Sequence, residues 1–369
     1  MSGQGVAQIL VYSGVLVLLA LPLGLYMAWA FERFSPRGIL GAIEKGFYRV
    51  VRTDPEQEQD WKSYGTTVLV FSVLFWGLLY LILRAQSHLF LNPDHMKAVP
   101  AHLSLNTAAS FITNTNWQFY AGESTMSYLS QMAGLAVQNF VSAAVGMAVL
   151  VAVVRGIARR SSGTLGNFWR DLYRSLVYVL LPLAVIATAI LIWQGVPQTF
   201  HGHATATTLQ GATQTIARGP VASQVAIKQL GTNGGGFYNS NSAAPPENPT
   251  GLSNLIEMLS LLLIPAAQVF MFGRMVLARR HAWAVFAAMF VVFAIGLAVN
   301  LPAEQHGSQV LRASGVNIIQ GHGQSGGNMA DKEVRFGQAA TSTWTVATSD
   351  ASNGSVNSGF DAQTPAGGA

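Results

Sequence analysis

The sequence of 369 residues contains no cysteine, so neither a disulfide framework nor a thiolate metal site is possible in it. Charged residues are also scarce: they make up 10% of the chain, against roughly 25% in an ordinary soluble domain. Half of the residues are hydrophobic. A low content of charged residues together with a high content of hydrophobic residues favours a protein that is embedded in a lipid bilayer.

The sequence also lacks the short motifs of common catalytic sites. We find no G-x-x-x-x-G-K-[ST] phosphate loop, no H-E-x-x-H and no G-x-S-x-G. The D-K-T-G phosphorylation motif that is typical of P-type ATPases is absent too. We therefore expect a protein without enzymatic activity, and in particular one that does not hydrolyse ATP.

Long apolar segments are the main positive feature. A helix needs about 20 mostly apolar residues to cross the hydrocarbon core of a bilayer, and it satisfies its own backbone hydrogen bonds there. The segments that meet this requirement are 6–31, 65–86, 127–154, 174–195, 252–273 and 282–301. The first has no basic residue before it and is too long for a signal peptide. We predict an all-α, multi-pass integral membrane protein with six spans.

Most of the basic residues fall in three of the connecting loops, 32–64, 155–174 and 274–281. They are Arg33, Arg37, Lys45, Arg49, Arg52, Lys62, Arg155, Arg159, Arg160, Arg170, Arg174, Arg274, Arg279 and Arg280. These loops lie on one side if the spans alternate, and the positive-inside rule makes that side cytoplasmic, with the N-terminus outside. Because these residues sit at helix ends instead of forming one patch, we expect no nucleic-acid partner despite the pI of about 9.6.

The predicted outward loops contain three similar polar stretches, 106–118, 221–237 and 336–355. Each begins with about ten small or apolar residues, enough for a half-helix, and continues into a cluster of Thr, Ser, Asn and Gly. Together with the spans they form a repeated unit of span, half-helix, polar loop and span. After the third loop no further span follows, so we expect a fragment or an early-terminated product; a flexible tail is the alternative.

The polar clusters suit a cation filter. A loop can enter the membrane where protein shields it, and rings of Thr and Gly carbonyls replace the hydration shell of potassium in channel filters. Glycine permits the backbone angles that aim successive carbonyls at one axis. The clusters Thr113–Asn116, Thr232–Gly236 and Ser352–Gly354 meet this requirement. The alternative is that they are ordinary exterior turns, which Asn and Gly also favour.

Three other features remain open at this stage. His201 and His203 are spaced to share a metal, or bind nothing in a flexible loop. Glu257 is either a functional intramembrane acid or a hydrogen-bond partner of a neighbouring loop. Gln131, Gln138 and Asn139, on the third span, either line a wet vestibule or hold helices together.

The polar stretches resemble a known family. The motifs are N-T-A-A-S-F-I-T-N-T-N-W-Q-F-Y-A-G-E at 106–123, S-Q-M-A-G-L-A-V-Q-N-F at 130–140, G-P-V-A-S-Q-V-A-I-K-Q-L-G-T-N-G-G-G-F-Y-N-S-N-S at 219–242, E-N-P-T at 247–250 and K-E-V-R-F-G at 332–337. In this combination and order they are similar to the potassium-binding subunit of Kdp-type potassium-transporting ATPases. That family has channel-like repeats around a pseudo-fourfold axis and one extra N-terminal span.

The resemblance implies an arrangement and a function. The segments would be an extra span with its cytoplasmic loop (1–62), two channel-like repeats (63–160 and 161–280) and an incomplete third repeat (281–369). The chain would bind K⁺ at the outer side of a bacterial inner membrane and pass it to a separate P-type ATPase subunit, which uses the ATP. A small single-span accessory subunit, a small membrane peptide and membrane lipids would be its other partners.

The residues that the resemblance assigns to the potassium filter are Thr113, Asn114, Thr115, Gln118, Thr232, Asn233, Gly234, Ser352, Asn353 and Gly354. Three-quarters of a filter would not enclose an ion, so we expect this chain to be inactive in transport by itself. The alternatives are a stand-alone, gradient-driven potassium transporter or channel of the same superfamily, and a membrane-anchored scaffold.

Overall fold

The computed structural model describes residues 3–159, 162–319, 321 and 326–369. It contains six helices that are long and apolar enough to cross a membrane, as predicted. Single helices form four of them: α1 (Gly3–Glu32), α3 (Trp61–Ala85), α10 (Gly251–Met275) and α11 (Arg279–His306). In the other two, π-helical segments continue into α-helix: η2 (Ser130–Ala136) with α6 (Val137–Ala158), and α7 (Phe168–Arg174) with η3 (Ser175–Leu180) and α8 (Leu181–Trp193).

The three predicted half-helices are present as α4 (Ala101–Ile112), α9 (Val221–Leu230) and α13 (Gly337–Asp350). Each one packs against the span that precedes it: α4 against α3, α9 against α8 and α13 against α11. The chain therefore repeats one spatial arrangement, a long helix followed by a shorter one folded back along it.

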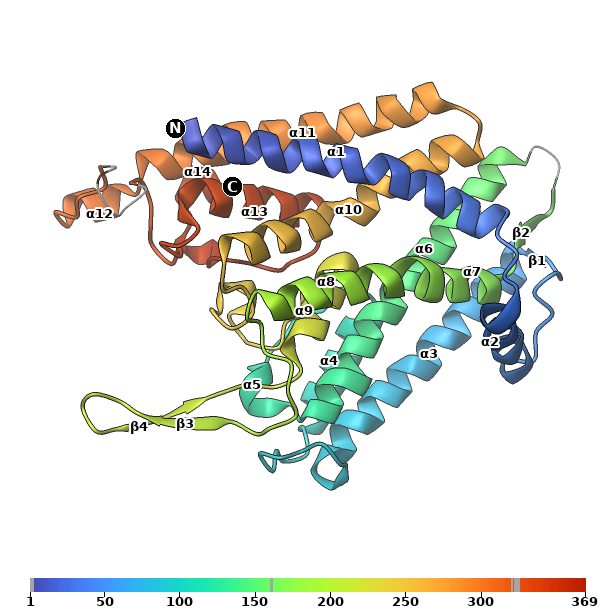
Figure 1. Ribbon diagram of the computed structural model, residues 1–369, viewed down its shortest axis with the longest axis horizontal. Helices are drawn as coiled ribbons and strands as arrows, with labels where there is room; N and C mark the ends of the chain where they lie inside the picture. The colour runs from blue at the N-terminus through green and yellow to red at the C-terminus, as the bar shows by residue number, and fades with distance from the viewer. Residues whose placement is uncertain (1–2, 160–161, 320, 322–325) are drawn as a thin grey trace.

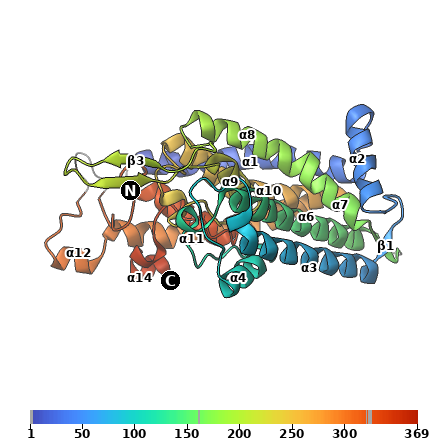
Figure 2. The same cartoon turned by 90° about the horizontal axis from the view of Figure 1, so that it is seen from below.

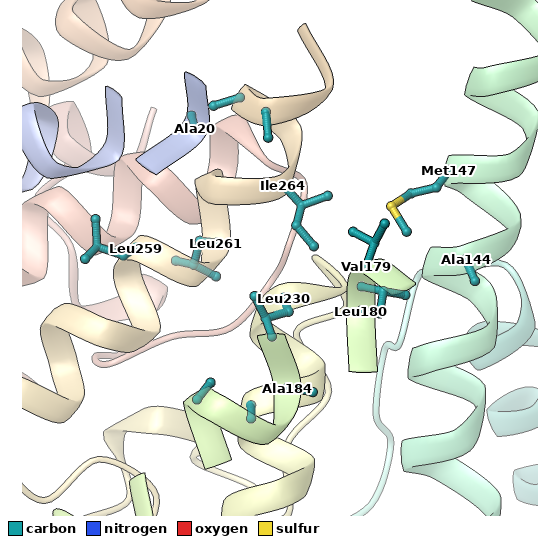
Figure 3. Close-up of a cluster of buried hydrophobic side chains, with 14 of the residues drawn as sticks. Ala20, Ala144, Met147, Val179, Leu180, Ala184, Leu230, Leu259, Leu261 and Ile264 are labelled. Carbon is teal, nitrogen blue, oxygen red and sulfur yellow. The ribbon is translucent and has the colours of Figure 1, made fainter. Parts of the chain in front are cut away.

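Small side chains allow the spans to approach closely in the centre of the bundle. A Cβ at Gly24 of α1 would overlap the Ala267 carbonyl oxygen of α10, so these two helices meet backbone to backbone. Figure 3 shows part of the apolar core, where Leu230 at the end of α9 lies in the same cluster as Leu180 and Leu261. The core thus fixes the end of a half-helix directly.

The three basic loops lie at the same end of the molecule (Figure 1), as their alternation predicts. Several of their residues hold helices together there. Arg155 bonds both carboxylate oxygens of the buried Asp171, at 2.6 and 2.9 Å, and also Glu32. Arg174 donates to the Ala30 and Phe31 carbonyls at the end of α1, both at 2.7 Å. Arg160 lies outside the described residues.

The chain is mostly helical, as predicted, and the structure adds two short pairs of strands. β1 (Gln59–Asp60) pairs with β2 (Thr164–Gly166), and β3 (Ala204–Thr207) with β4 (Thr213–Ile216), both antiparallel. The Thr-rich segments of the second pair favour strands, and Gly211, with φ of 82°, helps the chain turn between them. This hairpin extends away from the helices in both views (Figures 1 and 2).

The remaining elements lie outside the spans and the half-helices. The α-helices among them are α2 (Gly38–Val50), α5 (Gly122–Thr125), α12 (Gln309–Ala313) and α14 (Pro365–Gly368). The 3₁₀ turns are η1 (Gln86–His88), η4 (Asn241–Ala243) and η5 (Phe360–Ala362). The helix α2 begins soon after α1 and runs across its direction (Figure 1).

Candidate functional site

Three loops leave the C-terminal ends of the half-helices: loop 1 (113–118) after α4, loop 2 (231–236) after α9 and loop 3 (351–355) after α13. They share one backbone path. The second and fourth residues of each loop have positive φ: 62° and 55° at Asn114 and Asn116, 52° and 85° at Thr232 and Gly234, and 53° and 89° at Ser352 and Gly354. Alternation of this kind in three separate loops marks a repeated structure.

Hydrogen bonds to the half-helices confirm the equivalence. The amide of the third loop residue returns to a carbonyl of the last helical turn in every case: Thr115 to Ser110 at 3.0 Å, Asn233 to Lys228 at 2.9 Å, and Asn353 to Thr348 at 2.9 Å. These bonds satisfy carbonyls that a helix end leaves free. Ser110, Lys228 and Thr348 therefore occupy one position, although their side chains differ.

This frame places loop 1 one residue away from the predicted alignment. The predicted filter segments begin at Thr113, Thr232 and Ser352. In the structure, however, Thr113 directly follows the last residue of its half-helix, as Gly231 and Ala351 do, and these three residues are equivalent. By backbone geometry, Asn114 is the equivalent of Thr232 and Ser352. The segment that corresponds to Thr232–Gly234 is thus 114–116, which adds Asn116 to the candidate site.

Loops 1 and 2 are joined through amide side chains. The side-chain amide of Asn233 donates to the Asn114 Oδ1 and to Ser142 Oγ, the latter at 3.2 Å. Ser142, on α6, donates to the same Asn114 oxygen at 2.6 Å. Gln118 adds a paired contact with Gly236: its amide group donates to the Gly236 carbonyl and accepts from the Gly236 amide, both at 3.1 Å.

Loops 2 and 3 are joined differently, by close backbone packing. A Cβ at Gly234 would overlap the Asn353 carbonyl oxygen, so only glycine fits this position. The Asn353 side chain donates to the Lys228 carbonyl at 3.3 Å, and Ser355 Oγ donates to Gln229 at 2.9 Å. Loop 2 therefore touches both of the other loops.

The predicted residues differ in exposure. Asn233, Gly234 and Asn353 are buried, and Asn114, Gln118 and Thr232 are partly buried. Thr113, Thr115, Ser352 and Gly354 are exposed. The three loops together therefore offer a surface of hydroxyl and carbonyl oxygens on a buried amide framework.

A buried ion pair behind loop 2 was not predicted from the sequence. The Lys228 ammonium contacts Glu247 Oε2 and Asn241 Oδ1, and both charged side chains are fully buried. Asn241 in turn donates to the Gly234 carbonyl at 2.5 Å, and the Tyr238 amide donates to Glu247 at 2.9 Å. The sequence feature that could have indicated this ion pair is Lys228 itself, the one charged residue in the half-helix α9.

Burial, reinforced by the nearby carboxylates of Glu247 and Glu123, raises the pKa of Tyr238, which follows loop 2. Its hydroxyl is thus kept protonated and donates to the Ala217 carbonyl at 2.8 Å. The bond ties the segment after loop 2 to the segment that precedes α9.

The structure shows contacts for some of the features left open above. Glu257 accepts from Ser242 at 2.6 Å and from Gln229 at 3.0 Å, as expected for a hydrogen-bond partner of a neighbouring loop. Gln138 donates to the Phe75 carbonyl at 2.8 Å and so links α6 to α3. The Nε2 atom of His203 lies 3.6 Å from Oδ2 of Asp94. Within the described part of the chain, no three His, Cys, Asp or Glu residues gather as a metal site.

The oxygens of the three loops are neutral. No Asp or Glu occurs in 113–118, 231–236 or 351–355. Calcium and magnesium sites use carboxylates, whereas carbonyl and hydroxyl oxygens alone are the ligands of potassium filters. The donor set therefore fits a weakly hydrated monovalent cation.

Six candidate spans and three equivalent units of half-helix and polar loop, found among the described residues, define a multi-pass helical membrane protein with a repeated architecture. The comparison with known proteins agrees. The profile of the potassium-transporting ATPase A subunit family matches residues 10–369, and the chain belongs to this family. The resemblance noted from the motifs is thereby confirmed.

Individual relatives match over the whole chain. The potassium-transporting ATPase potassium-binding subunits of Rhodospirillum centenum and Methylobacterium radiotolerans are 52% and 53% identical to it over 370 residues. The subunit of Sorangium cellulosum is 52% identical over 379 residues. In each case all of this chain is aligned, but only 64%, 63% and 65% of the relative. The chain thus spans less than two thirds of the length of these relatives.

Proposed function

We propose that this chain is the potassium-binding part of an ATP-driven potassium uptake complex. The observation that carries the proposal is the common backbone frame of the three loops, with paired positive φ angles and the same return hydrogen bond. Family membership supports potassium as the ion that is bound, because the relatives are named as potassium-binding subunits.

The proposed ligands are oxygens of the loop backbones and hydroxyls. The residues are Thr113, Asn114, Thr115, Asn116, Gln118, Thr232, Asn233, Gly234, Ser352, Asn353 and Gly354. The half-helices end at these loops, so the negative ends of their dipoles favour a cation there. The side-chain amides of Asn114 and Asn233 would hold the loop backbones in position and leave the exposed oxygens for the ion.

The proposal assigns ATP hydrolysis to a partner, since the chain has neither a phosphate loop nor D-K-T-G. A P-type ATPase catalytic subunit would use the ATP, with a small single-span subunit and a small peptide completing the complex. The basic end of the molecule would face the cytoplasm of a bacterial cell, and the N-terminus the outside. The segments 63–160, 161–280 and 281–369 would act as channel-like repeats after the extra span in 1–62.

Cation-dependent stability tests the ion site. The purified chain in detergent is heated in K⁺, Rb⁺ or Na⁺ at constant ionic strength. Binding to the folded state raises the midpoint of unfolding, so we expect K⁺ and Rb⁺ to raise it more than Na⁺. Gly234→Asp places a carboxylate against loop 3 and should remove the difference. Equal midpoints in all three salts would refute a selective site in this chain.

Co-purification tests the partner. The chain is expressed together with the P-type ATPase subunit of a matching operon, and both are recovered through a tag on this chain. A stable complex favours the pump subunit. Recovery of this chain alone, with its potassium-dependent stability intact, favours the stand-alone transporter instead.

A further inference from the structure

A basic cavity lies at the turn between α10 and α11, away from the three loops. Its volume is about 550 Å³. It is lined by Gly273, Arg274, Leu277, Ala278, Arg279, Arg280 and His281. The lining thus combines three guanidinium groups and an imidazole over a stretch of nine residues.

The positive charge of this cavity is not compensated. The sequence contains no Asp or Glu between Glu257 and Glu304. Among the described residues, Arg274, Arg279 and Arg280 form no ion pair, and all three are exposed. This distinguishes them from Arg155, which is paired with Asp171 at the same end of the molecule. The free guanidinium groups are therefore available to an anion.

The turn that carries these groups is rigidly built. A Cβ at Gly273 would overlap the Cβ of Ala282, so α10 and α11 are in direct contact beside the cavity. The Ala278 amide donates to the Gly273 carbonyl at 2.9 Å, and Leu277 has a positive φ of 57°. The shape of the turn is therefore set by contacts within the chain, and the positive charge of the cavity comes from its arginine side chains.

Apolar side chains continue from the cavity along the outer face of α11. Val285, Met289 and Val292 lie on one face of this helix and are exposed, from 43% at Val285 and Met289 to 60% at Val292. A ligand with a phosphate and long acyl chains would match both parts: arginine forks bind phosphate oxygens in pairs, and the chains would cover the apolar face.

We propose that the α10–α11 turn is a binding site for the phosphate headgroup of an anionic phospholipid. The phosphate binds between Arg274 and Arg280, with Arg279 at the rim, and the acyl chains lie along α11. The site does not depend on the potassium loops, and it fixes the depth at which the α10–α11 hairpin sits in the membrane.

Lipid binding to the full chain in detergent tests the site by native mass spectrometry and by thermal unfolding. The probes are phosphatidylglycerol, phosphatidylcholine and inorganic phosphate. We expect phosphatidylglycerol to bind and to raise the unfolding midpoint, and phosphatidylcholine to do so weakly. If inorganic phosphate at millimolar concentration has the same effect as phosphatidylglycerol, the ligand is free phosphate and the lipid assignment is overturned.

Charge-matched variants separate a site from general attraction. Arg274→Gln with Arg280→Gln removes two charges from the cavity, and Lys45→Gln with Arg49→Gln removes two exposed charges from α2. At about 1.5 kcal/mol for each charge-assisted hydrogen bond that is lost, the cavity variant should bind phosphatidylglycerol roughly 100-fold more weakly. Equal losses in both variants would overturn the proposal. Arg274→Lys with Arg280→Lys keeps the charge at both positions. Comparing its folding with that of the Gln variant shows whether a loss of phosphatidylglycerol binding reflects misfolding.

Discussion

Loop 2 and loop 1 share a backbone frame but differ in their surroundings. Loop 2 lies between the other two loops, and from Asn233 to Tyr238 every residue is buried. Loop 1 has a loop on one side only, and Thr113 and Thr115 are exposed. A buried ion pair supports loop 2, whereas Ser110 occupies the position of Lys228 behind loop 1.

The difference indicates how the site is held together. The backbone path is set locally, by the helix end and two residues of positive φ, and is the same in each loop. The rigidity of the assembly comes from what surrounds loop 2. Substitutions in or behind loop 2 should therefore disturb the whole site, and equivalent substitutions in loops 1 and 3 should have smaller effects.

The largest effect is expected for Lys228→Met. The change leaves the Glu247 carboxylate buried without its counter-ion, at a cost of about 3–5 kcal/mol in the free energy of unfolding. Denaturant unfolding in detergent measures it. The double variant Lys228→Met with Glu247→Gln should recover much of the loss. The matched substitution Ser110→Ala removes only a hydrogen bond of 3.2 Å to the Trp117 carbonyl. Equal losses for Lys228→Met and Ser110→Ala would contradict the comparison.

Gly234→Ala should come next, at about 3 kcal/mol. The left-handed backbone disfavours a Cβ by about 1–2 kcal/mol, and overlap with Asn353 adds about 1–3 kcal/mol. Gly354→Ala is the matched control, because Gly354 has φ of 89° but no atom within 4 Å of an added Cβ. It should lose only the backbone contribution. We expect Gly234→Ala alone to abolish potassium-dependent stabilisation, and a similar response of both variants would refute close packing between loops 2 and 3.

Asn233→Ala is expected to cost about 2 kcal/mol, because it removes the two hydrogen bonds that a buried amide donates to Asn114 and Ser142. Thr115→Ala changes the equivalent residue of loop 1, whose side chain is exposed, and should cost well below 1 kcal/mol. Thermal unfolding and rubidium binding of both variants give the comparison. The interpretation fails if Thr115→Ala destabilises the protein as strongly as Asn233→Ala.

Apart from the control variants, Gln118→Ala should have the smallest effect, about 1 kcal/mol, since it removes two hydrogen bonds at the partly exposed edge between loops 1 and 2. Gln118→Glu, which keeps the acceptor and loses the donor, should fall between the wild type and Gln118→Ala. Unfolding midpoints measured in the same detergent give the order, and an unchanged midpoint for Gln118→Ala would remove this contact from the framework.

Much of this architecture follows from the sequence. The spans are predictable because about 20 apolar residues are needed to cross a bilayer and little else produces such runs. The half-helices and the polar clusters after them were also located correctly. These features depend on composition over ten or more residues, and single contacts hardly alter them.

The frame of loop 1 was harder to predict, for a physical reason. Its Thr-Asn-Thr-Asn sequence offers two matches to the Thr-Asn of loop 2, and the structure uses neither. Backbone angles decide the frame instead: Asn114 and Asn116 both adopt positive φ, and Asn116 takes the place that glycine has in loops 2 and 3. The spacing of these two asparagines therefore indicates the alignment of loop 1 with loops 2 and 3 better than the Thr-Asn match does.

The contacts behind the loops depend on distant parts of the chain. Glu247 lies nineteen residues after Lys228, and Ser142 meets Asn233 from another span, ninety-one residues earlier. Neither periodicity nor composition reports such pairs. The β3–β4 hairpin was missed because its four-residue, Thr-rich strands fall below the length at which alternation is informative.

That hairpin has a practical consequence for topology mapping. Its strands bond to each other in the register of Ala204 with Ile216, and Leu209 at its tip is fully exposed. Exposed loop tips tolerate inserted peptides. An epitope placed between Leu209 and Gly211 should leave the fold unchanged, and antibody labelling of intact cells would then report directly which side of the membrane this part of the chain occupies.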